Sequence, residues 1–403
     1  MPIFAAVTAM SIACSAPGAI HADLSEILPT ALPAYGVNGQ GIEPGGSDTG
    51  FAYSFAVPEG TWRVTVRLGS KSAAGDTTIK AESRRLMARS ITTRAGQYRD
   101  VSFLVPVRTP ALAPVPENAP GGHAVLVDTA EAETRDWDDR LTLEFLGRPA
   151  VAEICVEPAG EDVPTIYLAG DSTVADQPAE PAASWGQMLP ALFDERIAVA
   201  NHAKSGGTLK SFIAELRLAK ITETLKPGDY LLIQFGHNDQ KANWPQTHAD
   251  ARFAYPAYLR ALIAEARARG AHPVLVTSPE RRFFDDGRIR DTLAGYPDAM
   301  RKVAQAEGVP LVDLNRDSIA IYEALGEQRA ALAFNDGGRD RTHHDNYGAW
   351  LMANAVAAGL VKAVPALAPH LTAAPFDPEH PPLPGTVAIA PSLLHNSARP
   401  QGY

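Results

Sequence analysis

The stretch Thr165-Ile-Tyr-Leu-Ala-Gly-Asp-Ser-Thr-Val174 decides the fold predicted for the second half of this chain. Its first five residues are a short apolar run, which is typical of a strand buried on both faces. Gly170 and Asp171 favour a turn, so Ser172 is expected directly after the strand. Further apolar runs follow, separated by amphipathic helical stretches, which predicts a doubly wound α/β domain with a parallel sheet. These runs are residues 197–200, 230–235, 273–277 and 310–314, and the clearest helical stretch is 258–269.

The chain ahead of this domain has a different pattern. Residues 30–158 contain short segments in which apolar and polar residues alternate, the period of a half-buried strand. Turn residues separate these segments and no convincing helix interrupts them, so an all-β sandwich or jelly roll is predicted. The pattern changes near residue 162, and the α/β domain is expected over residues 163–364. The alternating segments are 51–57, 61–67, 101–107, 124–127 and 141–145.

Charge and composition restrict the partners of this chain of 403 residues. Its formal net charge is −10. Nucleic acid and anionic membrane surfaces bind basic patches, so neither is expected as a partner. We also expect the protein to be a monomer. A polyanionic substrate such as pectin would need basic residues gathered locally at a cleft. The last residues, 365–403, are rich in Pro and Ala without a clear period, which predicts a tail that wraps the surface or is partly disordered.

The first 22 residues predict an export signal. Residues 3–16 are small and apolar, and Ala16, Ala19 and Ala22 are suitable cleavage points. No Lys or Arg precedes the apolar run, so a start placed too late on a truncated signal explains the pattern as well as an intact signal does. In both cases a secreted or periplasmic protein is expected. No later run reaches the ~18 apolar residues that a membrane span needs, so membrane insertion is not expected.

The two cysteines, Cys14 and Cys155, lie far apart in the sequence. Because Cys14 falls inside the predicted signal, the mature chain is expected to hold one thiol and no internal disulfide. Its stability would then come from packing. In an alternative interpretation, Cys14 is a lipid-attachment site, since the small residues that precede it suit one, although Ser11 fits that pattern poorly.

Four polar segments are expected at one edge of the predicted sheet. In open α/β sheets, ligands bind beyond the carboxyl ends of the strands. Three of the segments directly follow a predicted strand, and the fourth comes just before the last predicted helix. We therefore expect their side chains to meet. The segments are residues 170–174, 201–208, 236–240 and 340–349.

Together these segments hold the groups that acyl transfer requires. Ser172, exposed at a strand-to-helix turn, is the candidate nucleophile, and His343 is its candidate base. Asp340 lies three residues before His343 and can orient the imidazole and stabilise its protonated form. The backbone N–H groups of Ser172 and Gly206 and the Asn238 amide are the candidate donors of an oxyanion hole. Any one of these residues alone would be an ordinary turn or capping residue, and the inference depends on their combination.

The four segments resemble the four blocks of the SGNH (GDSL-like) hydrolases, over roughly residues 165–364. More narrowly, the chain resembles the rhamnogalacturonan acetylesterase group in Gly170-Asp-Ser-Thr-Val174, Ser184-Trp-Gly-Gln-Met-Leu-Pro190, Gly236-His-Asn-Asp239, and Asp340-x-Thr-His343 with Tyr347-Gly-Ala349. The resemblance implies a flavodoxin-like sheet and removal of acetyl groups from pectic sugars without a metal or other cofactor. It also implies that the preceding sandwich resembles galactose-binding-like domains, which can bind carbohydrate or act as a spacer.

The second block departs from the pattern of this group. Its members commonly carry Gly-Arg-Ser, whereas this chain has Gly206-Gly207-Thr208. The glycine of the oxyanion hole is retained. The missing arginine puts a substrate contact or a supporting salt bridge in question, and with it the exact polysaccharide.

Other polar and aromatic residues near these blocks have two interpretations each. Trp185 either packs over the Ser172 turn or offers a platform for a sugar. Arg281 and Arg282 follow the fourth strand and either bind a uronate carboxylate or form a structural charge cluster. In the sandwich, Tyr98 or Trp137 is a candidate sugar-stacking residue. Adjacent histidines such as His343 and His344 rarely converge on one ion, so no metal is expected.

The favoured function from sequence is therefore a carbohydrate O-acetylesterase acting on rhamnogalacturonan-type or other acetylated plant polysaccharide. A xylan-type acetylesterase, or a lipase, lysophospholipase or thioesterase with the same catalytic residues, is the alternative. The longer-chain esterases need an apolar acyl channel, and residues 244–253, where a channel wall would lie, are polar. A non-catalytic carbohydrate-binding protein is disfavoured because all the expected catalytic residues are present.

Overall fold

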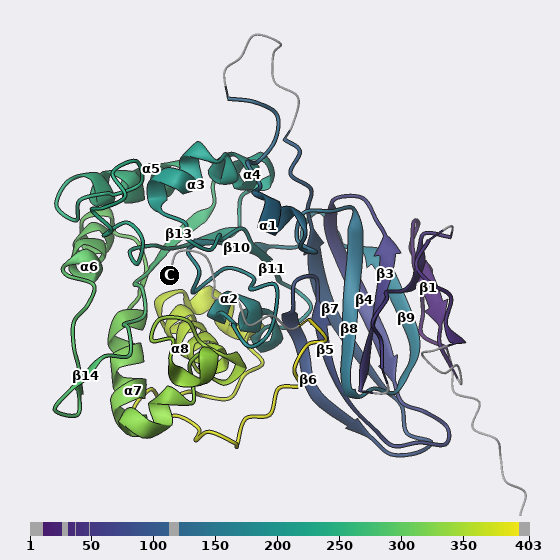
Figure 1. Ribbon diagram of the computed structural model, residues 1–403. Coiled ribbons are helices and arrows are strands. Elements are labelled where there is room, and N and C mark those ends of the chain that lie inside the picture. Colours follow the sequence, from purple (N-terminus) through teal and green to yellow (C-terminus); the bar gives the residue numbers. More distant parts are fainter. Residues whose placement is uncertain (1–10, 26–30, 37, 48, 113–120, 395–403) are drawn as a thin grey trace, which may run out of the picture.

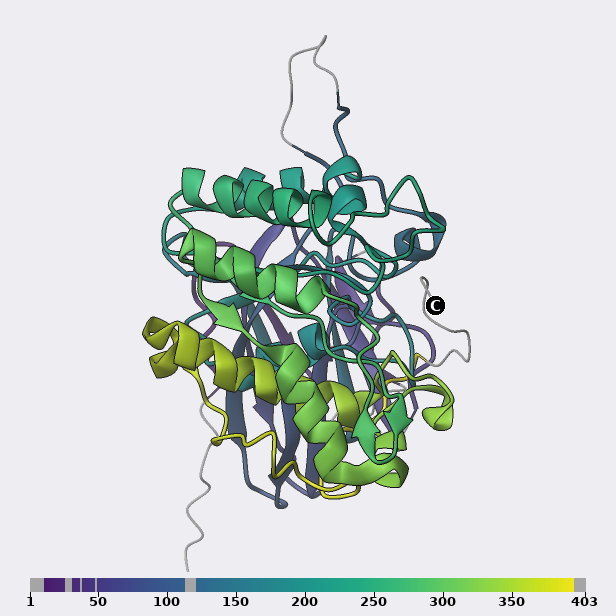
Figure 2. The same cartoon turned by 90° about the vertical axis from the view of Figure 1, so that its left-hand side faces the viewer.

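The computed structural model describes residues 11–25, 31–36, 38–47, 49–112 and 121–394. Figure 1 shows a β-sandwich beside an α/β domain, and Figure 2 views the α/β domain from its outer side, with the sandwich behind it. The two expected architectures are confirmed. No described helix is long and apolar enough to cross a membrane.

The centre of the α/β domain is a parallel sheet of five strands in the order β11-β10-β12-β13-β16. The central strands are buried on both faces, as the apolar runs predicted, because helices cover each side. The chain order reverses next to β10, so polar residues that follow β10, β11 and β12 meet at one edge. The bounds are β10 (Thr165–Gly170), β11 (Ala198–Asn201), β12 (Tyr230–Gln234), β13 (His272–Val276) and β16 (Leu311–Val312).

Two separate apolar cores lie on the two faces of this sheet. One core includes Trp185, Tyr322 and Leu351 from α2, α7 and α8. The other includes Phe212, Leu259 and other residues from α3, α4, α5 and α6. The helices are α2 (Trp185–Met188), α3 (Leu209–Ala214), α4 (Arg217–Thr224), α5 (Ala254–Ala268), α6 (Tyr296–Glu307), α7 (Leu314–Ala331) and α8 (Asn346–Ala363), with a small hairpin of β14 (Phe284–Asp285) and β15 (Arg288–Ile289) and 3-10 turns at Leu189–Leu192, Asp336–Gly338 and Pro365–His370.

The N-terminal domain consists of two antiparallel sheets with the strand orders β1-β9-β4-β7 and β2-β3-β8-β5-β6. Their facing sides enclose one apolar core that includes Phe55, Val64 and Phe145. The bounds are β1 (Ile20–Asp23), β2 (Gln40–Ile42), β3 (Gly50–Ala56), β4 (Gly60–Leu68), β5 (Gly75–Ala81), β6 (Arg85–Thr93), β7 (Arg99–Val107), β8 (Arg140–Arg148) and β9 (Val151–Pro158), with the short helix α1 (Thr129–Ala132) between β7 and β8.

Four of the five strands expected in this domain are present, and the strand expected at residues 124–127 is not. That segment contacts the α/β domain instead: the Leu126 N–H donates to the Glu215 carbonyl at 3.0 Å, and the Leu126 side chain is 59% exposed. Sequence patterning also missed β1, β2 and β9, and likewise β5 and β6. The alternation of β5 and β6 is hidden by charged residues such as Lys80 and Arg85, which are buried because the α/β domain supplies their partners.

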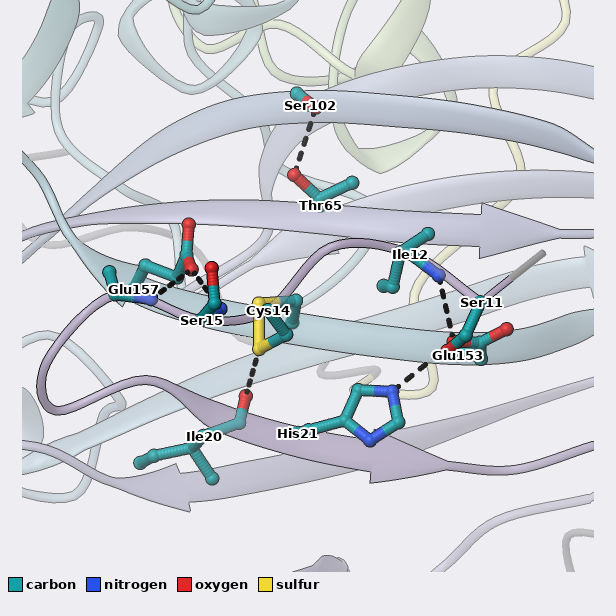
Figure 3. The surroundings of a disulfide bond; sticks show 12 residues. Ser11, Ile12, Cys14, Ser15, Ile20, His21, Thr65, Ser102, Glu153 and Glu157 are labelled. Atoms are coloured by element: carbon teal, nitrogen blue, oxygen red, sulfur yellow. Dashed lines mark hydrogen bonds and ion pairs between the residues drawn. A yellow bond between two sulfur atoms is a disulfide. The ribbon is translucent and has the colours of Figure 1, made fainter.

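The expectation of a single thiol is wrong. Cys14 forms a disulfide with Cys155 of β9, and the strand β1 pairs antiparallel with the same β9 (Figure 3). Glu153 accepts hydrogen bonds from the Ile12 N–H at 3.1 Å and from the Ser11 hydroxyl. Residues 11–16, the described part of the run that resembled an export signal, form an irregular segment that contacts β9 through Glu153 and Glu157. The boundary expected at residue 22 lies inside β1, and residues 1–10 are outside the described part of the chain.

The tail wraps across both domains as far as residue 394. The Ser392 N–H donates to Glu180 at 2.8 Å, and the Ser392 hydroxyl donates to Glu144 of β8 at 2.7 Å. Nearer the start of the tail, the Thr372 N–H donates to the Leu192 carbonyl at 2.9 Å. Residues 395–403 lie outside the described residues.

Glu180 also forms ion pairs with two cationic side chains of the sandwich. Lys80 Nζ lies 3.0 Å from Glu180 Oε1 and Arg84 Nη2 lies 2.8 Å from the same oxygen. All three side chains are buried. Burial alone would raise the pKa of Glu180, but the charges of Lys80 and Arg84 outweigh it and hold that pKa at about 2, below its usual value near 4.5.

We expect Cys14→Ser to lower the free energy of unfolding by about 2–4 kcal/mol, because the disulfide closes a loop across the domain and restricts the unfolded chain. The cysteines are separated by 141 residues. Urea unfolding of the two proteins under oxidising conditions measures the difference. The same comparison in strong reductant is the control, since both proteins then lack the bond; a difference that persists there would contradict this explanation.

Stability should fall at acid pH partly through Glu180. Because its pKa is depressed in the folded protein, its contribution is complete above about pH 4.5 and is lost as the pH falls towards 2. Melting temperatures measured between pH 6 and 2 should therefore decline less steeply in Glu180→Gln than in the wild type. Parallel curves for the two proteins would contradict the assignment.

Candidate active site

Ser172 lies in the turn that follows β10, where Asp171 maintains the turn. The Asp171 carboxylate accepts the Thr173 N–H at 3.0 Å and the Thr173 hydroxyl at 2.8 Å. Burial opposes ionisation of Asp171, but His237 and these hydrogen bonds outweigh it, so the pKa of Asp171 is lower than usual. The supporting role expected for Asp171 is therefore borne out by its contacts. His237 is held in turn by the Pro279 carbonyl, 2.8 Å from its Nε2.

Ser172, His343 and Asp340 form a continuous hydrogen-bonded chain. His343 Nε2 lies 2.8 Å from Ser172 Oγ, and His343 Nδ1 lies 2.9 Å from Asp340 Oδ2. The other Asp340 oxygen accepts the backbone N–H groups of Thr342 and His343, at 2.8 and 3.0 Å. Burial would raise the pKa of Asp340, but the hydrogen bonds and charge of His343 hold it below its usual range. Asp340 therefore stays ionised and can stabilise a protonated imidazole.

The three expected oxyanion donors lie at the same edge of the sheet. Within the described chain, neither the Ser172 nor the Gly206 backbone N–H donates to another residue. Gly206 has a φ of 77°, a conformation that favours glycine. Asn238 Nδ2 donates one hydrogen to the Gly207 carbonyl at 3.1 Å, which fixes the amide and leaves its second hydrogen for an oxyanion.

Gly207, which departs from the family pattern, leaves no room for a side chain. A Cβ at this position would lie 2.9 Å from the Lys204 carbonyl oxygen and 3.2 Å from that of Gly170. The backbone here is therefore adapted to glycine. An arginine in the same backbone would have to displace the loop that carries Gly206.

Asp239, to which sequence reasoning gave no role, connects two of the catalytic segments. Its Oδ1 accepts the Leu209 N–H at 2.9 Å, at the start of α3. Burial raises the pKa of Asp239 to about 7. The loop with Gly206 and the turn with Asn238 are thus joined directly. In the sequence, Asp239 could have been noticed as the last residue of the motif Gly236-His-Asn-Asp239. The spacing of the motif does not reveal the contact between Asp239 and Leu209.

Trp185 is not a sugar platform. Its side chain is completely buried in the core of the α/β domain, and its indole N–H donates to Gln234 at 2.7 Å. The next residue explains the tight packing, because a Cβ on Gly186 would lie 2.1 Å from the Val174 carbonyl oxygen. Helix α2 therefore packs directly on the turn that carries Ser172, and Trp185 is a structural residue.

The two candidate arginines differ in their surroundings. Arg281 lines the cavity that also contains Ser172 and His343, which we call the catalytic cavity. It donates to the Thr292 hydroxyl at 3.1 Å and to the His237 carbonyl at 3.3 Å. Arg282 is buried, contacts the Phe334 ring and donates to the Gly338 carbonyl. Arg282 does not line that cavity, and its role as a substrate contact stays a prediction.

His344 points away from its neighbour His343. Its Nε2 lies 2.8 Å from the Tyr322 hydroxyl in the core. Burial lowers the pKa of His344 to about 3, so it is neutral at ordinary pH. Asp345 caps α8 by accepting the Gly348 N–H at 2.9 Å. The two histidines therefore do not converge on one point.

The catalytic cavity has a volume of about 390 Å³ and collects positive charge. Four basic side chains line it, and no carboxylate does, which contrasts with the net charge of −10 of the chain. Arg341 lies over the Phe283 ring, with its guanidinium carbon 4.9 Å from the ring centroid. The lining residues are Ser172, His237, Asn238, Lys241, Arg281, Phe283, Arg339, Arg341, Thr342 and His343.

The sandwich supports the loop that follows Ser172. Gln177 Nε2 donates to the Ser172 carbonyl at 2.7 Å. The Gln177 carbonyl accepts hydrogen bonds from Arg84 of the β5–β6 turn at 3.1 Å and from Gln187 of α2 at 3.0 Å. Gln187 also donates to the Ser83 carbonyl of the same turn at 2.7 Å. Two buried residues, Gln177 and Gln187, thus connect the sandwich to the catalytic serine.

The family model described as GDSL-like lipase/acylhydrolase matches residues 168–351, which include Ser172, Gly206, Asn238, Asp340 and His343. The rhamnogalacturonan acetylesterase RhgT of Bacillus subtilis (strain 168) is 42% identical over 220 residues, 51% of this chain and 93% of that protein. The chain belongs to the GDSL-like lipase/acylhydrolase family. The probable rhamnogalacturonan acetylesterase YesY of the same organism is 38% identical over 48% of this chain and 91% of its own length. The uncharacterized esterase YxiM, also from that organism, is 26% identical over 75% of this chain and 72% of its own length.

Membership of the GDSL-like family and the site geometry agree that this chain is an ester hydrolase. The turn with Ser172 and the segment from Asp340 to His343 both lie inside the matched range. These are the same two segments that the tertiary structure brings into contact.

Ser172→Ala in this GDSL-like hydrolase should reduce kcat for acetate release by about 10⁶-fold, as removal of a serine nucleophile does elsewhere. Asp340→Asn should reduce it by about 10⁴-fold, because the imidazole loses the partner that fixes its tautomer. Release of 4-nitrophenol from 4-nitrophenyl acetate measures both. The variants should keep the circular dichroism spectrum of the wild type. Residual turnover by folded Ser172→Ala above a hundredth of the wild-type rate would exclude Ser172 as nucleophile.

Proposed function

We propose that this protein removes O-acetyl groups from rhamnogalacturonan-type pectic polysaccharide through an acetyl-enzyme formed on Ser172. The observation that carries the choice of polysaccharide is the set of basic side chains, free of any lining carboxylate, around the catalytic serine. Pectic chains carry carboxylates on their uronic acid residues, and guanidinium groups bind carboxylates well. The relatives named as rhamnogalacturonan acetylesterases support the same choice.

In the first half of the reaction, Ser172 Oγ attacks the acetyl carbonyl carbon while its proton passes to His343 Nε2, 2.8 Å away. The carbonyl oxygen becomes an oxyanion and accepts hydrogen bonds from the Ser172 and Gly206 N–H groups and the Asn238 amide. When the intermediate collapses, the bond to the sugar oxygen breaks. That oxygen takes the proton from His343, and the deacetylated sugar leaves.

In the second half, water attacks the acetyl group on Ser172 and gives a proton to His343. The same donors hold the second oxyanion. Its collapse breaks the bond to Ser172 Oγ, which recovers the proton from His343 and releases acetate. Asp340 remains ionised throughout and stabilises the imidazolium formed in each half.

The alternatives within the same chemistry fit the cavity less well. A xylan-type acetylesterase acts on a largely neutral backbone, which gives no reason for Lys241, Arg281, Arg339 and Arg341 to gather at the cavity. A lipase or thioesterase needs an apolar channel for its acyl chain, whereas Phe283 is the one apolar side chain among the residues that line this cavity.

We propose further that the protein is exported and acts as a monomer. The disulfide between Cys14 and Cys155 supports export, because such bonds persist in oxidising compartments. A polymeric substrate also has to be met outside the cell or in the periplasm.

Arg341→Gln should raise KM for acetylated rhamnogalacturonan by up to about fivefold, the ratio that corresponds to ~1 kcal/mol for a solvent-exposed charge contact. It should leave KM for acetylated xylan unchanged. Initial rates of acetate release from the two polymers, at low and at 0.5 M salt, measure the effect. Added salt should weaken binding of the pectic substrate by screening the same contacts.

Arg290→Gln is the matched control. Arg290 also lies over the Phe283 ring, at 5.1 Å, but does not line the cavity. Its substitution should leave both values of KM unchanged. The proposal that this cavity binds uronate would be refuted if the two substitutions had equal effects. It would also be refuted if the wild type hydrolysed acetylated xylan faster than acetylated rhamnogalacturonan.

A further inference from the structure

A second cavity of about 290 Å³ lies between the two domains. The sandwich contributes Arg108, which follows β7, and the segment from Asp128 to Trp137, which includes α1. The α/β domain contributes residues 175–179, Ala182 and residues 203–205. In Figure 1, α1 lies between α4 and the sandwich, which places this segment against the α/β domain. Neither domain alone forms this cavity.

The cavity adjoins the loops that carry the catalytic groups. Gln177 lines it and donates to the Ser172 carbonyl at 2.7 Å and to the Ser205 hydroxyl at 3.2 Å. Ser205 also lines the cavity and directly precedes Gly206 of the oxyanion hole. The cavity is therefore next to the loops that carry Ser172 and Gly206.

Arg108 is a buried cation with donors that have no partner in the described chain. Its side chain is 6% exposed, and its Nε and Nη1 atoms make no hydrogen bond there. Its guanidinium carbon lies 4.4 Å from the centroid of the Trp137 ring. Burial and the nearby charge of Arg85 lower the pKa of Arg108 to about 10. Buried, unpartnered donors on a charged group are costly, so they point to a missing acceptor.

The carboxylates that line the cavity are already paired with other cations. Asp136 and Asp176 lie 3.2 and 2.7 Å from Arg85. Glu131 accepts a hydrogen bond from Arg217 at 2.7 Å. The remaining one, Asp128, caps α1 by accepting the Glu131 N–H at 3.0 Å and lies 3.4 Å from Lys204. None of these four carboxylates hydrogen-bonds to the Nε or Nη1 atoms of Arg108.

We propose that the interdomain cavity is a subsite for a uronic acid residue of the substrate, whose carboxylate accepts hydrogen bonds from Arg108. This inference rests on the proposed function, because it assumes that the polymer bound at Ser172 carries carboxylates. It gives the sandwich a direct part in selecting the substrate, through its contact with the α/β domain. Trp137 then supports the guanidinium and is not itself the surface on which a sugar stacks.

The kinetic test uses Arg108→Gln with two substrates. For acetylated rhamnogalacturonan oligosaccharides we expect KM to rise by about 30-fold or more, as for removal of one member of a buried charge pair. Values of kcat, and both constants for 4-nitrophenyl acetate, should stay unchanged, because the small ester does not reach the cavity. An unchanged KM for the oligosaccharides would overturn the proposal, and so would equal losses on the two substrates, which indicate a structural role.

A second pair of variants keeps the test valid if Arg108→Gln does not fold. Ala130 is exposed on α1 and lines the cavity, whereas the neighbouring Thr129 is exposed and does not. Ala130→Trp should therefore fill the cavity and raise KM for the oligosaccharides, and Thr129→Trp should not. The same effect from both tryptophans, or from neither, would overturn the proposal.

Direct binding separates failure of this inference from failure of the proposed function. Calorimetry with the Ser172→Ala protein and deacetylated rhamnogalacturonan oligosaccharides needs no turnover. Binding that is lost with Arg108→Gln supports the subsite. Binding that is unaffected by Arg108→Gln overturns the subsite and leaves the proposed function standing. If the wild type hydrolyses 4-nitrophenyl acetate but neither binds nor deacetylates these oligosaccharides, the proposed function fails, and the subsite fails with it.

Discussion

The hydrogen bond from Gln177 to the Ser172 carbonyl is the contact on which the rest of the site depends. The turn after β10 places the buried serine at the cavity, but the loop that follows must be held for the hydroxyl to meet His343. Gln177 is itself held by Arg84 from the sandwich and by Gln187 from α2. The geometry of the nucleophile is therefore a property of both domains together, although all the catalytic residues belong to one.

The same interface explains why the sandwich buries so many charges. Lys80, Arg84 and Arg85 would be expensive to bury if the sandwich were alone, because each cation would lose its hydration. Glu180 and Asp176 of the α/β domain compensate them at distances of 2.7–3.0 Å. Such pairs add little net stability compared with apolar packing, but they allow one relative placement of the domains. That placement holds the Ser172 loop and forms the interdomain cavity.

Much of this protein could be predicted from sequence. Apolar runs separated by helical stretches indicated the parallel sheet, because strands buried on both faces must be apolar throughout. The positions of Ser172 and Asn238 directly after those strands, with His343 just before the last helix, indicated the proposed catalytic edge, since parallel strands bring their carboxyl ends together. The alternating segments of the sandwich indicated β3, β4, β7 and β8, whereas β5 and β6 were missed because buried charges interrupt their alternation.

The tertiary structure decided what local pattern cannot encode. The disulfide joins Cys14 to a cysteine 141 residues away, and the small apolar residues around Cys14 do not reveal that partner. Arg281 lines the cavity and its neighbour Arg282 does not, because adjacent side chains face different surroundings. Trp185 is completely buried and so has no surface to offer a sugar. The orphaned donors of Arg108 depend on the packing of two domains. Sequence by itself indicated an ester hydrolase and the residues proposed to carry its chemistry. Contacts between distant segments decided which of these residues meet and which charges line the cavity beside Ser172, because such contacts depend on packing and not on local pattern.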